Sequence, residues 1–245
     1  MGAAKAIRLA PIARAAANRI VKRNHYSEKW VNNSQVHIGV FLDGILEGVL
    51  QFGPSLDKRK VIGLVRDTPW NGFIELNRMA FSERLPRNSE SRALSIALRM
   101  MRKAYPHLQW VVSFADGAQC GDGTIYRAAG FVLTQIRPNK SIWQLGDVTY
   151  TDVGFRTGEG VRQRVCKASL TKGKHILADG SASMKGHIEA GAKPVEGNML
   201  RYLYFFDPSA RGRLTVPVLP FSEIERQGAG MYRGQKISRA KQGTG

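Results

Sequence analysis

The sequence predicts an α/β fold in which a mixed sheet is flanked by helices and a basic insertion precedes the last strand. Three observations favour this fold class. Strand-like apolar segments alternate with segments whose apolar residues recur at helical spacing. The chain has 245 residues, of which 43% are hydrophobic, so it can bury a substantial core. The segment LQWVVSFAD, residues 108–116, is almost continuously apolar, which is typical of a central strand.

The first part of the chain predicts a helix, a hairpin and a further strand. The alanine-rich segment PIARAAANRIV, residues 11–21, predicts the first helix because its apolar residues lie on overlapping faces. In residues 36–53, the pair Asp43-Gly44 stands between two apolar runs, which is a strong signal for a β-hairpin. The segment GFIELNRMAF, residues 72–81, predicts the next strand.

A second helix is predicted over SESRALSIALRMMRKA, residues 89–104, after a polar loop. A helix that begins beside the end of a strand is a common place to hold a phosphate, because its first N–H groups lack partners. Nucleotide-binding loops of this kind usually contain glycines, which let the backbone approach a pyrophosphate. The loop at Pro86–Ser91 contains no glycine, so we do not expect a close-fitting pyrophosphate cradle there.

The second part of the chain predicts a short helix and further strands. The short helix is expected from about Asp122 and ends near Gly130, in the position where glycine commonly terminates a helix. Strands are expected over residues 131–136, 141–146 and 199–207. Residues 150–197 lose this regularity and predict a basic insertion within a single domain over residues 10–220. Residues 221–245 predict a basic C-terminal tail.

The chain is strongly basic. Its 37 Lys and Arg residues against 19 Asp and Glu give a net charge of +18 and a pI near 10.4. Such an excess attracts polyanions, of which nucleic acid is the first candidate, although a ribosome-associated or generally basic phage or bacterial protein would carry the same charge. Basic side chains are dense in the predicted insertion, where a solvated loop is the alternative. The candidate nucleic-acid contacts there are Arg162, Arg164, Lys167, Lys172 and Lys174.

Cysteine usage and hydropathy exclude several classes of protein. With only Cys120 and Cys166, the chain predicts neither a disulfide scaffold nor a cysteine-based zinc site. No apolar run approaches the length of a membrane span, and the N-terminus lacks a signal-peptide apolar region. We therefore expect a soluble protein of a reducing compartment with no membrane partner; the oligomeric state stays open.

The order helix, hairpin, strand, helix, strand, short helix, strand resembles the core of GCN5-related N-acyltransferases. The segment GTIYRAAGF, residues 123–131, resembles the last motif of that superfamily. A narrower resemblance, over roughly residues 10–220, is to the Mom family of phage DNA-modification proteins. It is carried by six ordered blocks: NHYS, ELNRMAF, PRNSES, YPHLQWVVSFAD, GTIYRAAGF and RYLYFF. Many relatives have a histidine near the position of Asp122, so this chain departs from the pattern there.

The resemblance implies an enzyme that converts adenine in double-stranded DNA to N6-carbamoylmethyladenine. This modification protects phage DNA from host restriction, in the cytoplasm of the bacterial host. Because the adenine amino group lies inside the duplex, the base must be flipped out or otherwise exposed. Two alternatives stay open: an acetyl-CoA-dependent N-acetyltransferase acting on a protein or small amine, and a DNA-binding protein without enzymatic activity.

Four residues are candidates for catalysis. Tyr126 lies where related acyltransferases present a tyrosine to the leaving group, so it could act as a general acid. Asp116 ends a strand at the mouth of the sheet, where it could accept a proton from adenine N6. His25 and Tyr26 are candidates because histidine is suited to proton transfer near neutral pH. The alternatives are a packed tyrosine at 126 and a helix-cap or turn aspartate at 116.

Binding residues are predicted on the strand and loop before the second long helix. Arg78 could bind an anionic donor, or form a structural ion pair with Glu75. In the loop, the candidate donor contacts are Arg87, Asn88, Ser89 and Ser91. Helix capping is the alternative for at least one of the last three. Of the four tryptophans, Trp70 in the loop DTPWNG is the best candidate for stacking on a DNA base.

The group donor is expected to be either glycyl-tRNA or acetyl-CoA. A tRNA end needs no buried pyrophosphate cradle, which suits the loop without glycine, and tRNA would be a second nucleic-acid partner. An acetyl donor would require an oxidation, for which iron is a candidate. His25, Asp116 and Glu75 could form a mixed nitrogen and oxygen site for it, although no close-spaced ligand motif supports this.

Overall fold

A computed structural model of the chain describes residues 3–25, 27, 30–117, 121–140, 142–146, 148–151, 188–189, 191–232 and 235–236. The chain divides into two compact units. The first comprises residues 1–115, 123–135 and 200–223, and the second comprises residues 116–122, 136–199 and 224–245. Most of the predicted basic insertion, including its five candidate nucleic-acid contacts, lies outside the described residues.

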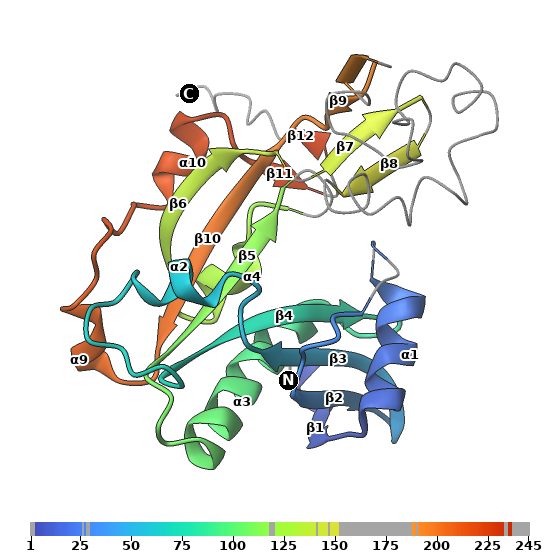
Figure 1. The fold of residues 1–245 in the computed structure, drawn as a ribbon. Coiled ribbons are helices and arrows are strands. Elements are labelled where there is room, and N and C mark those ends of the chain that lie inside the picture. Colours follow the sequence, from blue (N-terminus) through green and yellow to red (C-terminus); the bar gives the residue numbers. More distant parts are fainter. Residues whose placement is uncertain are drawn as a thin grey trace, which may run out of the picture. The chain divides into compact units, whose positions relative to one another are not determined.

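A seven-stranded mixed sheet forms the framework of the first unit, in the order β1-β2-β3-β4-β5-β10-β6 (Figure 1). Its strands are β1 (Arg8–Pro11), β2 (Val36–Leu42), β3 (Ile45–Gly53), β4 (Phe73–Phe81), β5 (Trp110–Asp116), β6 (Val132–Pro138) and β10 (Asn198–Phe205). Strands β1 to β4 pair antiparallel in succession, whereas β4 and β5 are parallel. The predicted mixed sheet is therefore confirmed.

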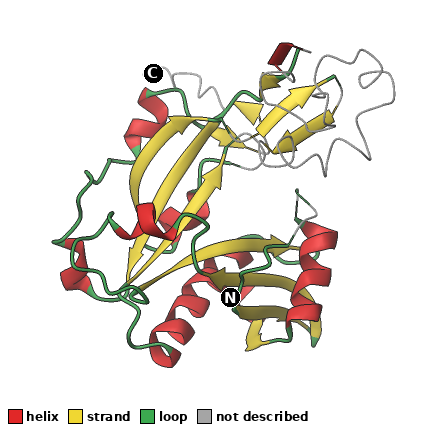
Figure 2. Cartoon of the chain, in the orientation of Figure 1, coloured by secondary structure: helices red, strands yellow, loops and turns green. Residues whose placement is uncertain are grey.

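Helices flank this sheet, as Figure 2 shows. They are η1 (Ala3–Ala6), α1 (Arg14–Asn24), α2 (Lys58–Ile62), α3 (Ser89–Ala104), α4 (Thr124–Ala128), α9 (Pro208–Arg211) and α10 (Ser222–Arg226). Helix α1 packs Ala17, Ile20 and Val21 against Val49 and Ala80 of the hairpin side of the sheet. None of the helices in the described part of the chain is long and apolar enough to cross a membrane.

The hairpin and the second long helix follow the prediction closely. Asp43 and Gly44 both have positive φ, of 51° and 78°, as the turn between right-twisted antiparallel strands requires. Helix α3 has the predicted bounds, because its apolar residues form one continuous stripe toward the core.

The prediction for the first helix is wrong at its N-terminus. Residues Arg8–Pro11 form the edge strand β1, in which Pro11 pairs with Ile38, and the helix begins only at Arg14. Proline is tolerated at such an edge because it need not donate a ladder hydrogen bond. A strand of four residues stabilised by a distant partner leaves little local signal in the sequence.

The second unit contains short strands: β7 (Ile142–Leu145), β8 (Val148–Thr151), β9 (Lys193–Pro194), β11 (Met231–Tyr232) and β12 (Gln235–Lys236). Strand β7 pairs with both β8 and β9, and Asn139 braces this small sheet through hydrogen bonds to Ile142 and Val195. Helix α10 and the pair β11–β12 fall within residues 221–245, so the region expected to be a tail contains regular structure.

Candidate functional site

The parallel pairing of β4 with β5 is short. It joins Phe73 with Trp110, Ile74 with Val111 and Glu75 with Val112, whereas β4 continues to Phe81. Beyond Glu75, no further ladder pair joins the two strands in the described part of the sheet. The described residues of β4 beyond Glu75 therefore pair with β3 alone.

A register shift in β4 changes which side chains share a face. Gly53 of β3 pairs with Glu75 and Gln51 pairs with Arg78, so β4 has one residue more than β3 in this interval. This is a β-bulge, which reverses the alternation of side chains along the strand. As a result, Glu75 and Arg78 lie on the same face although they are three residues apart.

A polar cluster surrounds Glu75. Ser55 and Asn77 donate side-chain hydrogen bonds to the Glu75 carboxylate, and Asn77 Oδ1 accepts a hydrogen bond from Ser34 Oγ at 3.1 Å. Burial raises the pKa of Glu75 above its usual value, although the two hydrogen bonds and the charge of Arg78 act to lower it. The carboxyl group is thus held ready for protonation at a higher pH than an exposed glutamate.

His25 lies at the C-terminal end of α1 and joins this cluster through Arg78. Its Nδ1 accepts a hydrogen bond from the Ser27 backbone N–H at 3.1 Å and lies 2.8 Å from Ser27 Oγ. Burial, helped by the positive charge of Arg78, lowers the pKa of His25 to about 3. The environment therefore favours a neutral imidazole at neutral pH, with its proton on Nε2. Tyr26 lies outside the described residues.

The structure brings together some of the predicted site residues but not the proposed metal ligands as a group. Arg78 interacts electrostatically with both His25 and Glu75, and its Nη1 also donates to the Asn77 carbonyl oxygen at 2.8 Å. Asp116 is a buried residue at the end of β5 and belongs to the second unit. Among the residues that the structure describes, no three His, Cys, Asp or Glu side chains gather closely enough to hold a metal ion.

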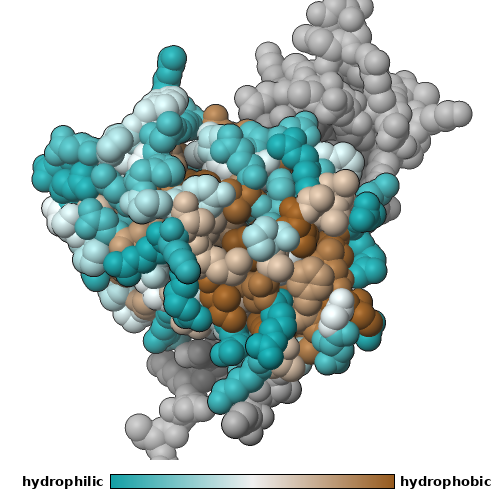
Figure 3. All heavy atoms as spheres, turned by 90° about the horizontal axis from the view of Figure 1, so that it is seen from below, coloured by the Kyte–Doolittle hydropathy of each residue, from teal (hydrophilic) through white to brown (hydrophobic). Residues whose placement is uncertain are grey.

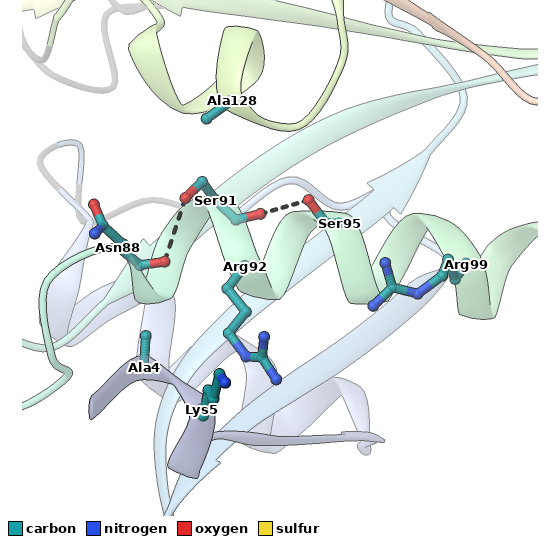
Figure 4. A pocket seen from close by; sticks show the side chains of 8 residues that line it. All are labelled: Ala4, Lys5, Asn88, Ser91, Arg92, Ser95, Arg99 and Ala128. Carbon is teal, nitrogen blue, oxygen red and sulfur yellow. Dashed lines mark hydrogen bonds between the residues drawn. The ribbon is translucent and has the colours of Figure 1, made fainter. Parts of the chain in front are cut away.

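A pocket of about 340 Å³ lies along the N-terminal half of α3 (Figure 4). It is lined by Ala4, Lys5, Asn88, Ser91, Arg92, Ser95, Arg99 and Ala128. Three of these side chains carry a positive charge, and none of the lining side chains is acidic. The pocket is therefore suited to an anionic group such as a phosphate.

The start of α3 does not have a side-chain cap. Asn88 adopts a left-handed conformation with φ of 71°, and its side chain makes no capping hydrogen bond. The Ser91 hydroxyl instead donates to the Asn88 carbonyl oxygen at 3.3 Å, and the Ser95 hydroxyl donates to the Ser91 carbonyl oxygen at 2.8 Å (Figure 4). Capping by these residues, the alternative to donor binding, is therefore wrong for Asn88 and Ser91.

The predicted donor contacts divide between the pocket and other places. Asn88 and Ser91 line it, whereas Arg87 is exposed and does not. Ser89 is fully buried toward the core, and its hydroxyl finds no hydrogen-bond partner among the described residues. Sequence reasoning missed the basic lining residues Lys5, Arg92 and Arg99. For the two arginines a signal existed, because they lie with Asn88 and Ser95 at helical spacing opposite the apolar stripe.

Tyr126 lies on α4, within an aromatic cluster. Only 8% of its surface is exposed, and its ring centroid is 5.1 Å from that of Tyr202 and 5.4 Å from that of Phe131. Gly123, with φ of 82°, directly precedes this helix, and a Cβ at that position would lie 2.5 Å from the Tyr202 ring. The role of Tyr126 as a general acid stays a prediction, since the ring also has the surroundings of a packed tyrosine.

Of the predicted nucleic-acid contacts, Trp70 lies among the described residues. On the face shown in Figure 3, a broad hydrophilic area borders a smaller hydrophobic one. Trp70 is exposed, as stacking on a base would require, and the Lys58 ammonium lies 4.6 Å from the centroid of its ring. Its role in DNA binding stays a prediction.

Two kinds of comparison relate this chain to known proteins. It is 44% identical over 128 residues to the methylcarbamoylase Mom of Escherichia phage Mu, an alignment that covers 52% of this chain and 53% of that protein. The match thus spans about half the length of the curated relative. Among solved structures, the chain is similar to an IAA acetyltransferase from Bacillus cereus ATCC 14579, with 11% identity, 81% and 99% of the two chains covered and a TM-score of 0.43.

A second solved structure gives a similar result. The ribosomal-protein-S18-alanine N-acetyltransferase from Escherichia coli is 12% identical, with 82% of this chain and 94% of that chain covered and a TM-score of 0.42.

The comparison with protein families matches a longer part of the sequence, since the model of the Mom protein family matches residues 6–223. Because this match includes most of the chain, the chain belongs to the Mom protein family.

Proposed function

We propose that this chain is a DNA-modifying transferase that converts adenine to N6-carbamoylmethyladenine. The observation that carries the proposal is the 44% identity to a protein named as the methylcarbamoylase of phage Mu. The net charge of +18 supports duplex DNA as the partner, because DNA binding depends on neutralising phosphates. The modification would protect phage DNA from host restriction enzymes in the cytoplasm of the bacterial host.

The product restricts the choice of group donor. Its bond to the adenine nitrogen is made through a methylene carbon, whereas direct acetyl transfer makes a bond through a carbonyl carbon. An acetyl donor would therefore need an oxidant for the methyl carbon and a separate source of nitrogen. A glycyl donor carries both the methylene carbon and the nitrogen at the required oxidation state.

We infer a glycyl ester as the donor, with this sequence of steps. Adenine N6 attacks the glycyl carbonyl carbon and expels the ribose oxygen of the tRNA end, giving N6-glycyladenine. The free glycyl amine then attacks adenine C6 through a five-membered ring. Cleavage of the original C6–N6 bond leaves that nitrogen as the terminal amide, so the product forms without any oxidation or reduction.

The acyl transfer needs one group that accepts a proton and one that donates a proton. Asp116, at the end of β5, would accept the proton that N6 loses, and Tyr126 would protonate the departing ribose oxygen. In the second step, the proton that the glycyl amine loses balances the proton that the departing nitrogen gains. Lys5, Arg92 and Arg99, which line the pocket on α3, would hold a phosphate of the donor. Acetyl-CoA also carries phosphates, so the pocket by itself does not choose between the two donors.

Mass analysis of nucleosides from plasmid DNA, isolated after expression of the protein, tests the proposed function. We expect a deoxyadenosine that is heavier by the carbamoylmethyl group. Plasmid DNA that stays unmodified, while the purified protein acetylates an amine or only binds DNA, would favour one of the two alternatives and contradict the proposal.

A labelling experiment tests the donor separately. Purified protein and DNA are supplied either with ¹³C,¹⁵N-glycine charged on tRNA or with labelled acetyl-CoA. We expect both glycine labels in the product, with the ¹⁵N between C6 and the methylene carbon. Label that arrives only from acetyl-CoA would exclude the glycyl donor while leaving the modification itself intact.

A further inference from the structure

The connection between β3 and β4 exposes hydrophobic side chains to an unusual degree. Leu56 is 85% exposed and Trp70 is 54% exposed, which makes them the two most exposed large hydrophobic residues in the described part of the chain. Neither is needed to close the core. Single exposed hydrophobic residues are common on protein surfaces, but here two of them stand on one connection that also carries several cations.

This connection is held firmly in place. Thr68 Oγ1 accepts a hydrogen bond from Trp110 Nε1 at 3.0 Å and donates one to the Val65 carbonyl oxygen at 2.7 Å. Arg213 Nη1 donates to the carbonyl oxygens of Arg66 and Asp67 at 2.7 and 3.0 Å. The loop that carries the exposed tryptophan is therefore presented by a braced backbone, which lowers the entropic cost of binding.

Positive charge surrounds the exposed hydrophobic residues. Lys58 lies over the ring of Trp70 and donates to Asn71 Oδ1 at 3.2 Å. The exposed cations Arg59, Lys60 and Arg66 lie on the same connection, against only the acids Asp57 and Asp67, of which the first pairs with Lys60 at 2.9 Å. Aromatic rings beside cations are the combination that proteins use to hold stacked bases and phosphates.

The same connection begins at the polar cluster on β4. Ser55 donates a hydrogen bond to the Glu75 carboxylate, and Leu56 is the next residue along the chain. The exposed Leu56 therefore directly follows Ser55, a residue of the buried polar cluster around Glu75. Proteins that kink DNA or expose a base commonly insert such an apolar wedge between base pairs.

We propose that Leu56 is a wedge that enters the base stack of duplex DNA beside the target adenine, while Trp70 and Lys58 hold the neighbouring base and phosphate. This inference rests on the proposed function and adds the surface that exposes the base. The leucine fills the space that the extruded adenine leaves, which offsets part of the cost of unstacking.

Fluorescence of 2-aminopurine tests the wedge without requiring chemistry. A mixed-sequence duplex carries 2-aminopurine at scattered adenine positions, and its emission rises when a base leaves the stack. We expect the wild-type protein to raise the emission and Leu56→Ala to lose at least half of that rise. We also expect Leu56→Ala to modify duplex DNA about tenfold more slowly or worse, because unstacking is then less well compensated.

Two variants serve as controls. Leu56→Met keeps a flexible apolar side chain and should retain the rise in emission. Ile45→Ala removes another exposed hydrophobic side chain, which is 48% exposed at the opposite end of β3, and should behave as the wild type. An unchanged rise in emission with Leu56→Ala would overturn the inference.

The experiment separates this inference from the function on which it rests. If the wild-type protein modifies duplex DNA and Leu56→Ala is equally active, only the wedge is overturned. If the wild-type protein neither modifies DNA nor raises the emission, both proposals are overturned.

Discussion

The pocket on α3 and the polar cluster on β4 hold charge in opposite ways. The pocket displays the cations Lys5, Arg92 and Arg99 around an open space, without an acidic lining residue. In the cluster, Arg78 is shared between the Glu75 carboxylate and the His25 imidazole, and the pKa values of both partners are shifted by burial. The first arrangement attracts an anion from solution, whereas the second fixes the protonation states of groups inside the protein.

Substitutions in the pocket on α3 should therefore affect binding, whereas substitutions in the polar cluster on β4 should affect folding. A cation that faces an open pocket can be neutralised at little cost to stability. A cation that compensates a buried carboxylate cannot, because its removal leaves an unpaired charge.

Tyr126→Phe tests whether the aromatic cluster on α4 belongs to the chemistry or only to the packing. The variant removes one hydroxyl from a ring that keeps its contacts with Tyr202 and Phe131, so we expect nearly unchanged stability. General acid groups typically contribute ~100- to 10,000-fold, and modification should fall by an amount in this range. Single-turnover modification of plasmid DNA measures it, with Tyr105→Phe as the matched control. Near-normal modification would remove Tyr126 from the chemistry.

Arg78→Met should destabilise the protein more than a matched substitution at the surface. It leaves Glu75 with its hydrogen bonds but without the neighbouring positive charge, so we expect the free energy of unfolding to fall by about 2–3 kcal/mol. Urea denaturation measures this, and Arg87→Met, at an exposed position, should change stability by less than about 0.5 kcal/mol. Equal stability of the two variants would show that Arg78 does not compensate the buried carboxylate.

The pH dependence of stability should reveal His25. Its folded pKa of about 3 lies below the unfolded value of 6.5, so between these values the unfolded chain binds one proton more. Stability should therefore fall as the pH drops below 6.5, by about 1.4 kcal/mol for each pH unit.

His25→Asn should flatten this acid-side slope. Glu75 works in the opposite sense, because its raised pKa favours the folded state as the pH falls, and Glu75→Gln should therefore steepen the slope. Urea titrations of the three proteins between neutral and acidic pH measure both effects. A His25→Asn variant with the wild-type slope would contradict the prediction.

The double variant Arg92→Gln, Arg99→Gln should hardly change the stability of the protein but should weaken its affinity for the donor. We expect a loss of about tenfold in the apparent affinity for the donor, with stability within about 0.5 kcal/mol of the wild type. The dependence of the initial modification rate on donor concentration measures it. Arg102→Gln, in the last turn of the same helix, is the matched control, and an equal loss in both proteins would remove the pocket from donor binding.

Prediction from the sequence succeeded for the elements that are determined by a local pattern of residues. Helix α3 was predictable from its apolar stripe, and the hairpin from Asp43-Gly44, because both depend on neighbours within a few residues. The β1 strand was missed since its stability comes from pairing with β2 across the chain. An interaction of Glu75 with Arg78 was one of the two predicted roles of Arg78, but the bulge that places both side chains on one face was not predicted, because it is set by register with β3.

The bulge in β4 also limits how the length of this chain can change. Deletion of Asn77, the residue for which β3 has no counterpart, would restore regular alternation through the strand. Glu75 and Arg78 would then be two residues apart and would still share a face, with the pairs Gly53–Glu75 and Gln51–Arg78 retained, so the loss would be confined to Asn77 and its hydrogen bonds with Glu75 and Ser34. Deletion of a residue in the regular part of β4, between Arg78 and Phe81, would instead turn every side chain on one side of the deletion to the opposite face of the sheet. The strand should therefore tolerate a deletion at the bulge better than a deletion in its regular part.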